Sequence, residues 1–292
     1  MAELQERAML VHLTIEQWTA TRNDKRVVRE VAEKHRTNGR KIGNFSKKLI
    51  DPDALKPLSQ AINAAREDHR ELTLPFDDVG YRLLPAVGYE GYCETMRRHR
   101  IGFERERSKF IEVYPELVSD ARTELGSLFR ATEYPRHDDL NRRFGFRTSF
   151  RPIPDSGHFV VEVASEQAAS IDQDARRAAE RAAMDVWHRV HDRAKKLATG
   201  LRAYADDSGE VQRNFRSSLI ENIEHLADLL PKLNFMADPG LDQMARRLKD
   251  DLCRYRADTL KQAPDLRHEI AGQADRVCDD VDKVLSSLSG YI

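Results

Sequence analysis

The stretch 170–207, "SIDQDARRAAERAAMDVWHRVHDRAKKLATGLRAYADD", constrains the fold more than any other part of the sequence, because it contains no proline and no polar break. Ser170 and Gln173 have the spacing of a helix-capping box. At ~1.5 Å per residue, a helix of this length would extend on the order of 50 Å. So long an element needs a partner of similar length to cover its apolar stripe.

Three further stretches have helical patterns and supply such partners: 210–233, 238–262 and 265–288. The turns between them are short, which favours antiparallel neighbours. We therefore predict a helical bundle or a coiled-coil hairpin as a C-terminal domain over 166–292.

The hydrophobic period changes to two in "FGFRTSFRPIPDSGHFVVEV" (144–163). The "PDSG" stretch is a turn signal, so this segment predicts a β-hairpin whose second strand is "HFVVEV". Because a lone hairpin is marginally stable, it needs another strand. "AMLVHLTIEQW" (8–18) is rich in β-branched residues and is predicted to supply that strand.

Helices fill the rest of the predicted N-terminal domain, 1–165. One is expected at 24–35, capped by Asp24, and another at 52–72. Residues 37–44 and 73–92 are interpreted as loops. A long helix is expected from Tyr89 to Tyr114, with a new helix beginning at Pro115. The fold class is therefore mostly α with a small antiparallel sheet (α+β), followed by long antiparallel helices.

The composition excludes several classes of protein. Charged residues make up 33% of the chain and hydrophobic residues 40%, which suits amphipathic helices and disfavours a buried parallel sheet. Cys93, Cys253 and Cys278 are far apart and predict neither a disulfide framework nor a zinc site. The sequence has no 18-residue apolar run and no signal peptide, so we expect a cytoplasmic protein with no membrane contact.

No catalytic motif is present: GxSxG, GxGxxG, GxxxxGK[ST] and HExxH are all missing. We therefore expect a non-enzymatic protein without a cofactor, with a site built from scattered residues as the alternative. Two His and carboxylate clusters lie at helical spacing, at 185–192 and 221–228. Solvated helix flanks explain them as well as metal ligation does, and no metal site is predicted.

The segment 22–48 contains ten Lys or Arg and three Asp or Glu, in a chain whose formal net charge is −1. Such a segment is typical of phosphate-backbone binding. The candidate residues are Lys25, Arg26, Arg29, Arg40, Lys41, Lys47 and Lys48. Arg97, Arg98, Arg100, Arg142 and Arg143 would widen the surface if the fold gathered them. The alternative is a solvated face paired with the acidic segments 51–53, 67–71 and 77–78.

The charge is divided unevenly along the chain. Residues 1–151 carry 28 Lys and Arg and 24 Asp and Glu, a net charge of +4, and the remaining residues carry −5. The boundary between the two net charges lies near the predicted hairpin.

The chain resembles a bacterial and phage protein family of unknown function in three stretches, residues 13–35, 73–92 and 114–163. Members of that family are often encoded in phages, prophages or mobile regions, beside MoxR- or CobS-like AAA+ ATPases and CobT-like von Willebrand factor A proteins. The resemblance implies an adaptor or scaffold that acts with an AAA+ ATPase. The alternative function is sequence-independent nucleic-acid binding by 22–48. The oligomeric state stays open.

Overall fold

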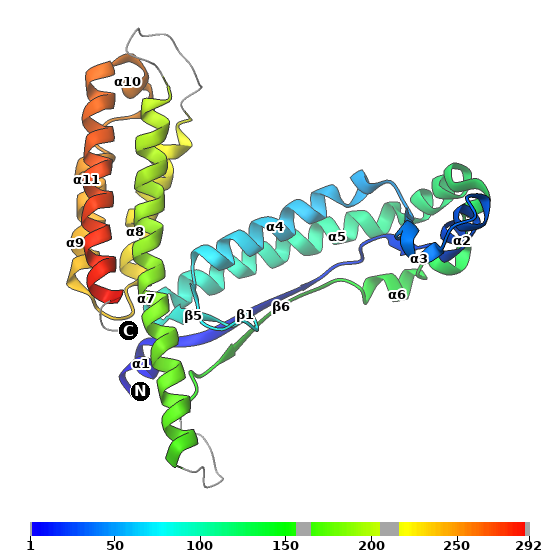
Figure 1. Ribbon diagram of the computed structural model, residues 1–292, viewed down its shortest axis with the longest axis horizontal. Helices are drawn as coiled ribbons and strands as arrows, with labels where there is room; N and C mark the ends of the chain where they lie inside the picture. The colour runs from blue at the N-terminus through cyan, green and yellow to red at the C-terminus, as the bar shows by residue number, and fades with distance from the viewer. Residues whose placement is uncertain (1, 156–164, 205–215, 290–292) are drawn as a thin grey trace. The chain divides into compact units, whose positions relative to one another are not determined.

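A computed structural model describes residues 2–155, 165–204 and 216–289 (Figure 1). The chain forms two compact units. Unit 1 comprises residues 1–12, 70–92 and 149–292, and unit 2 comprises residues 13–69 and 93–148. The fold class is confirmed, because long helices dominate and the strands form small antiparallel sheets. The predicted division into 1–165 and 166–292 stays a prediction, since each unit is assembled from separate stretches of chain.

The helices of unit 1 pack around α7 (Ser165–Arg202), which lies side by side with α11 (Pro264–Ser289) and α8 (Ser218–Leu233) (Figure 1). Val186, Val190 and Ala194 recur every four residues on α7 and are fully buried, as a helical stripe requires. Between α8 and α11 lie α9 (Pro239–Arg247), a π-helix (Leu248–Leu252) and α10 (Ala257–Gln262). The long helices of the C-terminal half are thus confirmed.

The boundaries of these helices differ from the prediction. Helix α7 begins at Ser165, so Ser170 lies inside the helix and does not cap it. Ala168 and Ala169 are strong helix formers, which explains the extension toward the N-terminus. Helix α8 begins at Ser218. Residues 210–215, expected at the start of this helix, and residues 205–207, expected at the end of the preceding one, lie outside the described residues.

A four-stranded sheet has the order β4-β5-β1-β6, and β1 (Ala8–Glu16) lies beside β6 (Gly145–Arg151) as predicted. In unit 1, β1 pairs antiparallel with β5 (Arg82–Pro85), and β5 pairs with β4 (Leu74–Pro75). The loop expected at 73–92 was therefore wrong in part, because it contains two strands. The second predicted hairpin strand, 158–163, lies outside the described residues. Helix α1 (Ala2–Arg7) precedes β1, and a 3₁₀ helix (Ala86–Gly88) follows β5.

Helices α4 (Lys56–Glu71) and α5 (Tyr89–Leu125) run alongside each other in unit 2 (Figure 1), and His99 Nε2 lies 2.7 Å from Asp68 Oδ2. The expected break at Pro115 was wrong, because α5 continues through it. Proline in a helix interior costs about 3 kcal/mol. The burial of Phe110, Ile111 and Tyr114 on one face of the preceding turns offsets that cost.

An aromatic core fixes the positions of the other segments of unit 2. Trp18 packs edge-on against Tyr114, with the ring centroids 5.6 Å apart, and Phe110 contacts Phe144 at 5.8 Å. A 3₁₀ helix (Pro52–Leu55) precedes α4, two more (Gly126–Leu128 and Ala131–Glu133) follow α5, and α6 (His137–Asn141) leads to β6.

The basic segment folds into two helices between two paired strands. Strand β2 (Thr21–Asn23) pairs antiparallel with β3 (Ser46–Lys48), and α2 (Lys25–Lys34) and α3 (Gly39–Ile42) lie between them in sequence. The Asp24 side chain caps α2, as predicted. Part of the expected loop at 37–44 is instead α3, which Asn38 caps through the Arg40 N–H.

Candidate nucleic-acid interface

Helices α2 and α3 are packed against each other (Figure 1), so their exposed Lys and Arg residues belong to one small region of unit 2. A Cβ added at Gly39 would lie 3.7 Å from Ala32 Cβ, an ordinary van der Waals distance, so the two helices are in contact at this point. The Asp24 N–H donates to the Phe45 carbonyl at 2.9 Å, which ties the start of α2 to the residue before β3. The sequence-predicted residues on α2, α3 and β3 are thereby brought together.

Six of the seven predicted residues are exposed, and we call them together the basic surface: Lys25, Arg26, Arg29, Arg40, Lys41 and Lys48. Three further residues in the same segment, Arg22, Lys34 and Arg36, are also exposed. Only two exposed acidic residues, Glu30 and Glu33, accompany these nine cations. The segment therefore presents a large excess of positive charge to the solvent.

Lys47 differs from the other six, because only 2% of the residue is exposed. Its ammonium group lies 2.6 Å from Glu133 Oε2 and 3.4 Å from Asp24 Oδ2, and it donates to the Leu128 carbonyl at 2.7 Å. Two carboxylates and one carbonyl therefore surround the ammonium group. Lys47 therefore anchors β3 to the segment that follows α5, and the basic surface as we define it does not include it.

Asp24 is buried at the N-terminus of α2, next to residues of the basic surface. Its carboxylate accepts the Arg26 backbone N–H at 3.0 Å and the Arg26 guanidinium at 2.9 Å. Burial acts to raise the pKa of this carboxyl. The hydrogen bond from the Arg26 backbone and the charges of Arg26 and Lys47 outweigh that effect and hold the pKa below its ordinary value of 3.8. Asp24 thus stays ionised and caps α2.

Helix α2 also carries an apolar face that is not fully covered. Val27, Val28 and Val31 are only half-buried, and α2 has no fully buried residue. Ile42 and Phe45, at the end of α3 and just beyond it, are 37% and 38% exposed. The basic surface is therefore bordered by apolar side chains that a macromolecular partner would cover.

The two units carry opposite net charges. Unit 2 contains 24 Lys and Arg and 18 Asp and Glu, a net charge of +6, whereas unit 1 contains 24 and 31, a net charge of −7. The charge division expected from the sequence is thus wider between the compact units than between the two halves of the chain. An anionic macromolecule would be attracted to unit 2.

The sequence matches the model of one protein family. The model of a family described as "Protein of unknown function (DUF3150)" matches residues 5–205. The chain belongs to this family. No curated protein and no solved structure matches the sequence. In this DUF3150 protein the matched range includes all of unit 2, and with it the basic surface, whereas helices α8 to α11 lie beyond it.

In the two His and carboxylate clusters of the DUF3150 chain, Asp185 and Asp228 pair with cations, and His191 and His225 lie near carboxylates. Asp185 accepts a hydrogen bond from Arg189 at 2.8 Å, and His188 is exposed. His225 lies 3.5 Å from Glu71, and Asp228 pairs with Lys249 at 2.5 Å. In the described part of the chain, no three His, Cys, Asp or Glu side chains are grouped to hold a metal ion.

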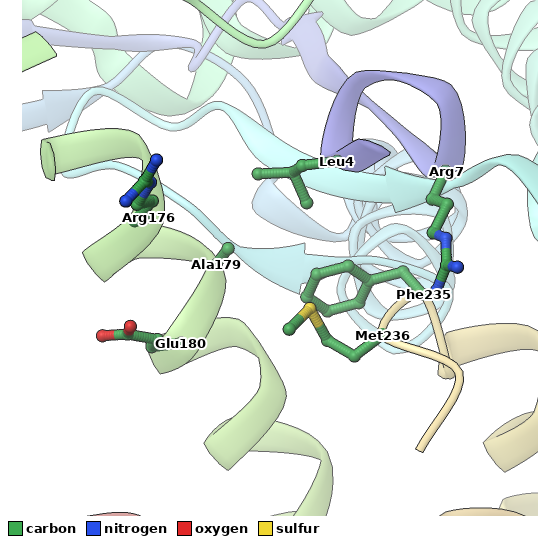
Figure 2. A pocket seen from close by; sticks show the side chains of 7 residues that line it. All are labelled: Leu4, Arg7, Arg176, Ala179, Glu180, Phe235 and Met236. Atoms are coloured by element: carbon green, nitrogen blue, oxygen red, sulfur yellow. The ribbon is translucent and has the colours of Figure 1, made fainter. Parts of the chain in front are cut away.

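Unit 1 has a hollow of about 290 Å³ between α1, α7 and the turn after α8 (Figure 2). Its lining residues are Leu4, Arg7, Arg176, Ala179, Glu180, Phe235 and Met236. Figure 2 shows Phe235 and Met236 together at one side, with Glu180 pointing away from them. The described lining offers no histidine, cysteine or hydroxyl group, and Glu180 is the carboxylate among its residues.

Two arginines that the sequence analysis missed are structural in unit 1. Arg189 donates to the carbonyls of Glu71 and Thr73, both at 2.7 Å, at the C-terminal end of α4. Arg82 donates to the hydroxyl and the carbonyl of Thr73. Burial, with the neighbouring Arg189 charge, lowers the pKa of Arg82 to about 10. No sequence pattern marks them, because their partners are backbone carbonyls distant in the chain.

The additional arginines named from the sequence do not all join the basic surface. Arg97 and Arg100 lie in the first turns of α5, whereas Leu128, which contacts Lys47, follows the end of that helix. At ~1.5 Å per residue these positions are roughly 40 Å apart along the axis. Arg142 is paired with Asp139 at 2.5 Å.

In the described part of the chain, no helix is long and apolar enough to cross a lipid bilayer.

Proposed function

We propose that the basic surface of this DUF3150 protein binds the phosphate backbone of nucleic acid without reading its sequence, in a non-enzymatic role. One observation carries the proposal: nine exposed cations and two exposed acidic residues share the segment 22–48 at one end of unit 2. Exposed Lys and Arg side chains attract a phosphate backbone through their charge and need no base contacts to do so.

The proposal predicts how affinity depends on salt. Each phosphate that a Lys or Arg neutralises releases bound counterions, so six contacts on duplex DNA give a log–log slope of roughly −5. Binding is expected to be similar on duplexes of different sequence, because contacts from Lys and Arg to phosphate groups carry no direct sequence information. A fluorescence-anisotropy titration of two labelled duplexes at three salt concentrations measures both properties.

A charge-matched pair of variants tests the location. The interface variant changes Lys25, Arg29, Arg40, Lys41 and Lys48 to Gln. The control variant changes five exposed basic residues elsewhere on unit 2 to Gln: Lys56, Arg66, Arg98, Arg105 and Lys109. We expect the interface variant to lose most of the salt slope and the control to retain it. Equal losses in both would reduce the effect to net charge and refute the assigned surface.

We propose as a second function that the protein is an adaptor or scaffold acting with an AAA+ ATPase, as the family resemblance implies. The half-exposed face of α2, with exposed Ile42 and Phe45, favours a protein partner at this place. Ile42→Ser with Phe45→Ser is expected to abolish co-elution with an AAA+ ATPase of the MoxR or CobS type and to leave the salt slope on DNA unchanged. Separate elution of the unmodified proteins, with and without ATP, would contradict the adaptor function.

A further inference from the structure

A second positively charged feature of unit 2 is a hollow between the first turns of α5 and strand β6. Three arginines line it: Arg97 and Arg100 from α5 and Arg147 from β6. Met96 and Phe146 supply apolar lining, and Phe146 is held in place by Phe103, whose ring centroid is 5.7 Å away. No acidic side chain belongs to the described lining. The hollow therefore concentrates positive charge over an apolar base.

The arginines are available to a ligand. Among the described residues, Arg147 takes part in no ion pair and no side-chain hydrogen bond. Arg97 pairs with Glu94 on the same helix, with the Arg97 side chain 58% exposed, and Arg100 lies 3.8 Å from Glu104 with its side chain 57% exposed. Exposed pairs of this kind contribute little to stability, so a doubly charged anion can displace the carboxylates.

The size of the hollow limits which ligands it can enclose. Its volume is about 240 Å³, below the ~300–1,000 Å³ typical of pockets that enclose a whole small molecule. A phosphate group fits this space, whereas the rest of a larger ligand would remain outside. Guanidinium groups recognise phosphate through two parallel N–H donors, which a lysine cannot provide.

We propose that the hollow between α5 and β6 is a phosphate-binding site formed by Arg97, Arg100 and Arg147. It is separate from the basic surface and does not rest on the proposed nucleic-acid function. The phosphate has two sources: a small phosphorylated ligand, or the backbone of a nucleic-acid strand that also contacts the basic surface.

Calorimetric titration of the full chain with inorganic pyrophosphate tests the site. We expect saturable binding that Arg147→Gln weakens at least about tenfold, because a charge-assisted hydrogen bond and its charge are lost. Arg98→Gln is the matched control, since exposed Arg98 lies on the same helix but does not line the hollow. Arg147→Lys should restore only part of the affinity. Arg100→Gln is an independent variant if Arg147→Gln lowers the helical circular-dichroism signal.

Absence of saturable pyrophosphate binding would overturn the proposal, as would equal weakening by Arg147→Gln and Arg98→Gln. A labelled single-stranded oligonucleotide distinguishes the two sources. If Arg147→Gln lowers the magnitude of its salt slope by about one as well, the hollow holds a strand phosphate; if only pyrophosphate binding changes, it holds a small ligand. The five-residue interface variant should keep pyrophosphate binding, so failure of the proposed function leaves this test intact.

Discussion

Replacement of Lys47 by Met should destabilise unit 2 strongly, although the residue lies in a segment of exposed cations. Methionine retains most of the apolar length of the side chain and removes the ammonium group. The Glu133 carboxylate, whose side chain is 15% exposed, then loses the cation at 2.6 Å. The Leu128 carbonyl loses its donor at the same time.

The expected magnitude follows from the cost of leaving a charge buried without its partner. Removing one member of a buried ion pair costs about 3–5 kcal/mol. The partial exposure of Glu133 lets water reach it, so we expect about 3 kcal/mol for Lys47→Met. Neighbouring Lys48 is exposed, and Lys48→Met should change stability by no more than about 0.5 kcal/mol. Adding Glu133→Gln to Lys47→Met should recover at least about 1 kcal/mol.

Urea unfolding followed by tryptophan fluorescence measures these changes in one unit. Trp18 lies in the core of unit 2 and Trp187 in that of unit 1, so a Trp187→Phe background isolates the signal of unit 2. The same midpoint for Lys47→Met and Lys48→Met would refute the internal role of Lys47. A double variant no more stable than Lys47→Met would show that the stranded Glu133 charge is not the cause.

Three further predictions concern other residues. Arg189→Gln should cost about 2–4 kcal/mol in thermal unfolding, because it strands carbonyls at the end of α4, whereas exposed Arg181→Gln should cost less than about 0.5 kcal/mol. The pKa of Asp24 is lowered by folding, so its contribution to stability is complete above the unfolded pKa and is lost as the pH falls through the folded pKa. The urea midpoints of wild type and Asp24→Asn should therefore converge as the pH falls below about 4. A difference between the midpoints that stays constant with pH would contradict this. Burial, with the charge of Glu224, raises the pKa of the Cys253 thiol to about 12. Iodoacetamide at neutral pH should therefore modify this thiol about two to three orders of magnitude more slowly in the native chain than in the unfolded chain. Mass spectrometry of the modified protein measures the two rates.

The sequence predicted elements that are long and periodic. The stripe of α7 extends over many turns, and the alternation before residue 151 marks β6. It missed β4 and β5 because these strands have two and four residues and end in prolines. The continuity of α5 through Pro115 depends on burial of the turns before it, which local rules do not include.

The candidate site could likewise be predicted from the sequence only in part. The excess of positive charge was visible in the sequence, and six of the predicted residues are exposed. The exception, Lys47, pairs with Glu133, which lies far along the chain, and nothing near Lys47 distinguishes it from Lys48. Arg147 was missed for a similar reason, because it joins Arg97 and Arg100 only when β6 is placed beside α5.

The interleaving of the two units has a consequence for the order of synthesis. The last residue of unit 2 is Thr148, so this unit can close while most of unit 1 is still to be made. Unit 1 must wait, since the Gln5 side chain donates to the Ile153 carbonyl and α7 is covered by α11, whose first residue is Pro264. Until α11 emerges from the ribosome, the part of α7 that α11 covers presents its apolar side chains to water. That interval is when the nascent chain is most prone to aggregate, and a chain halted before α11 would remain in it.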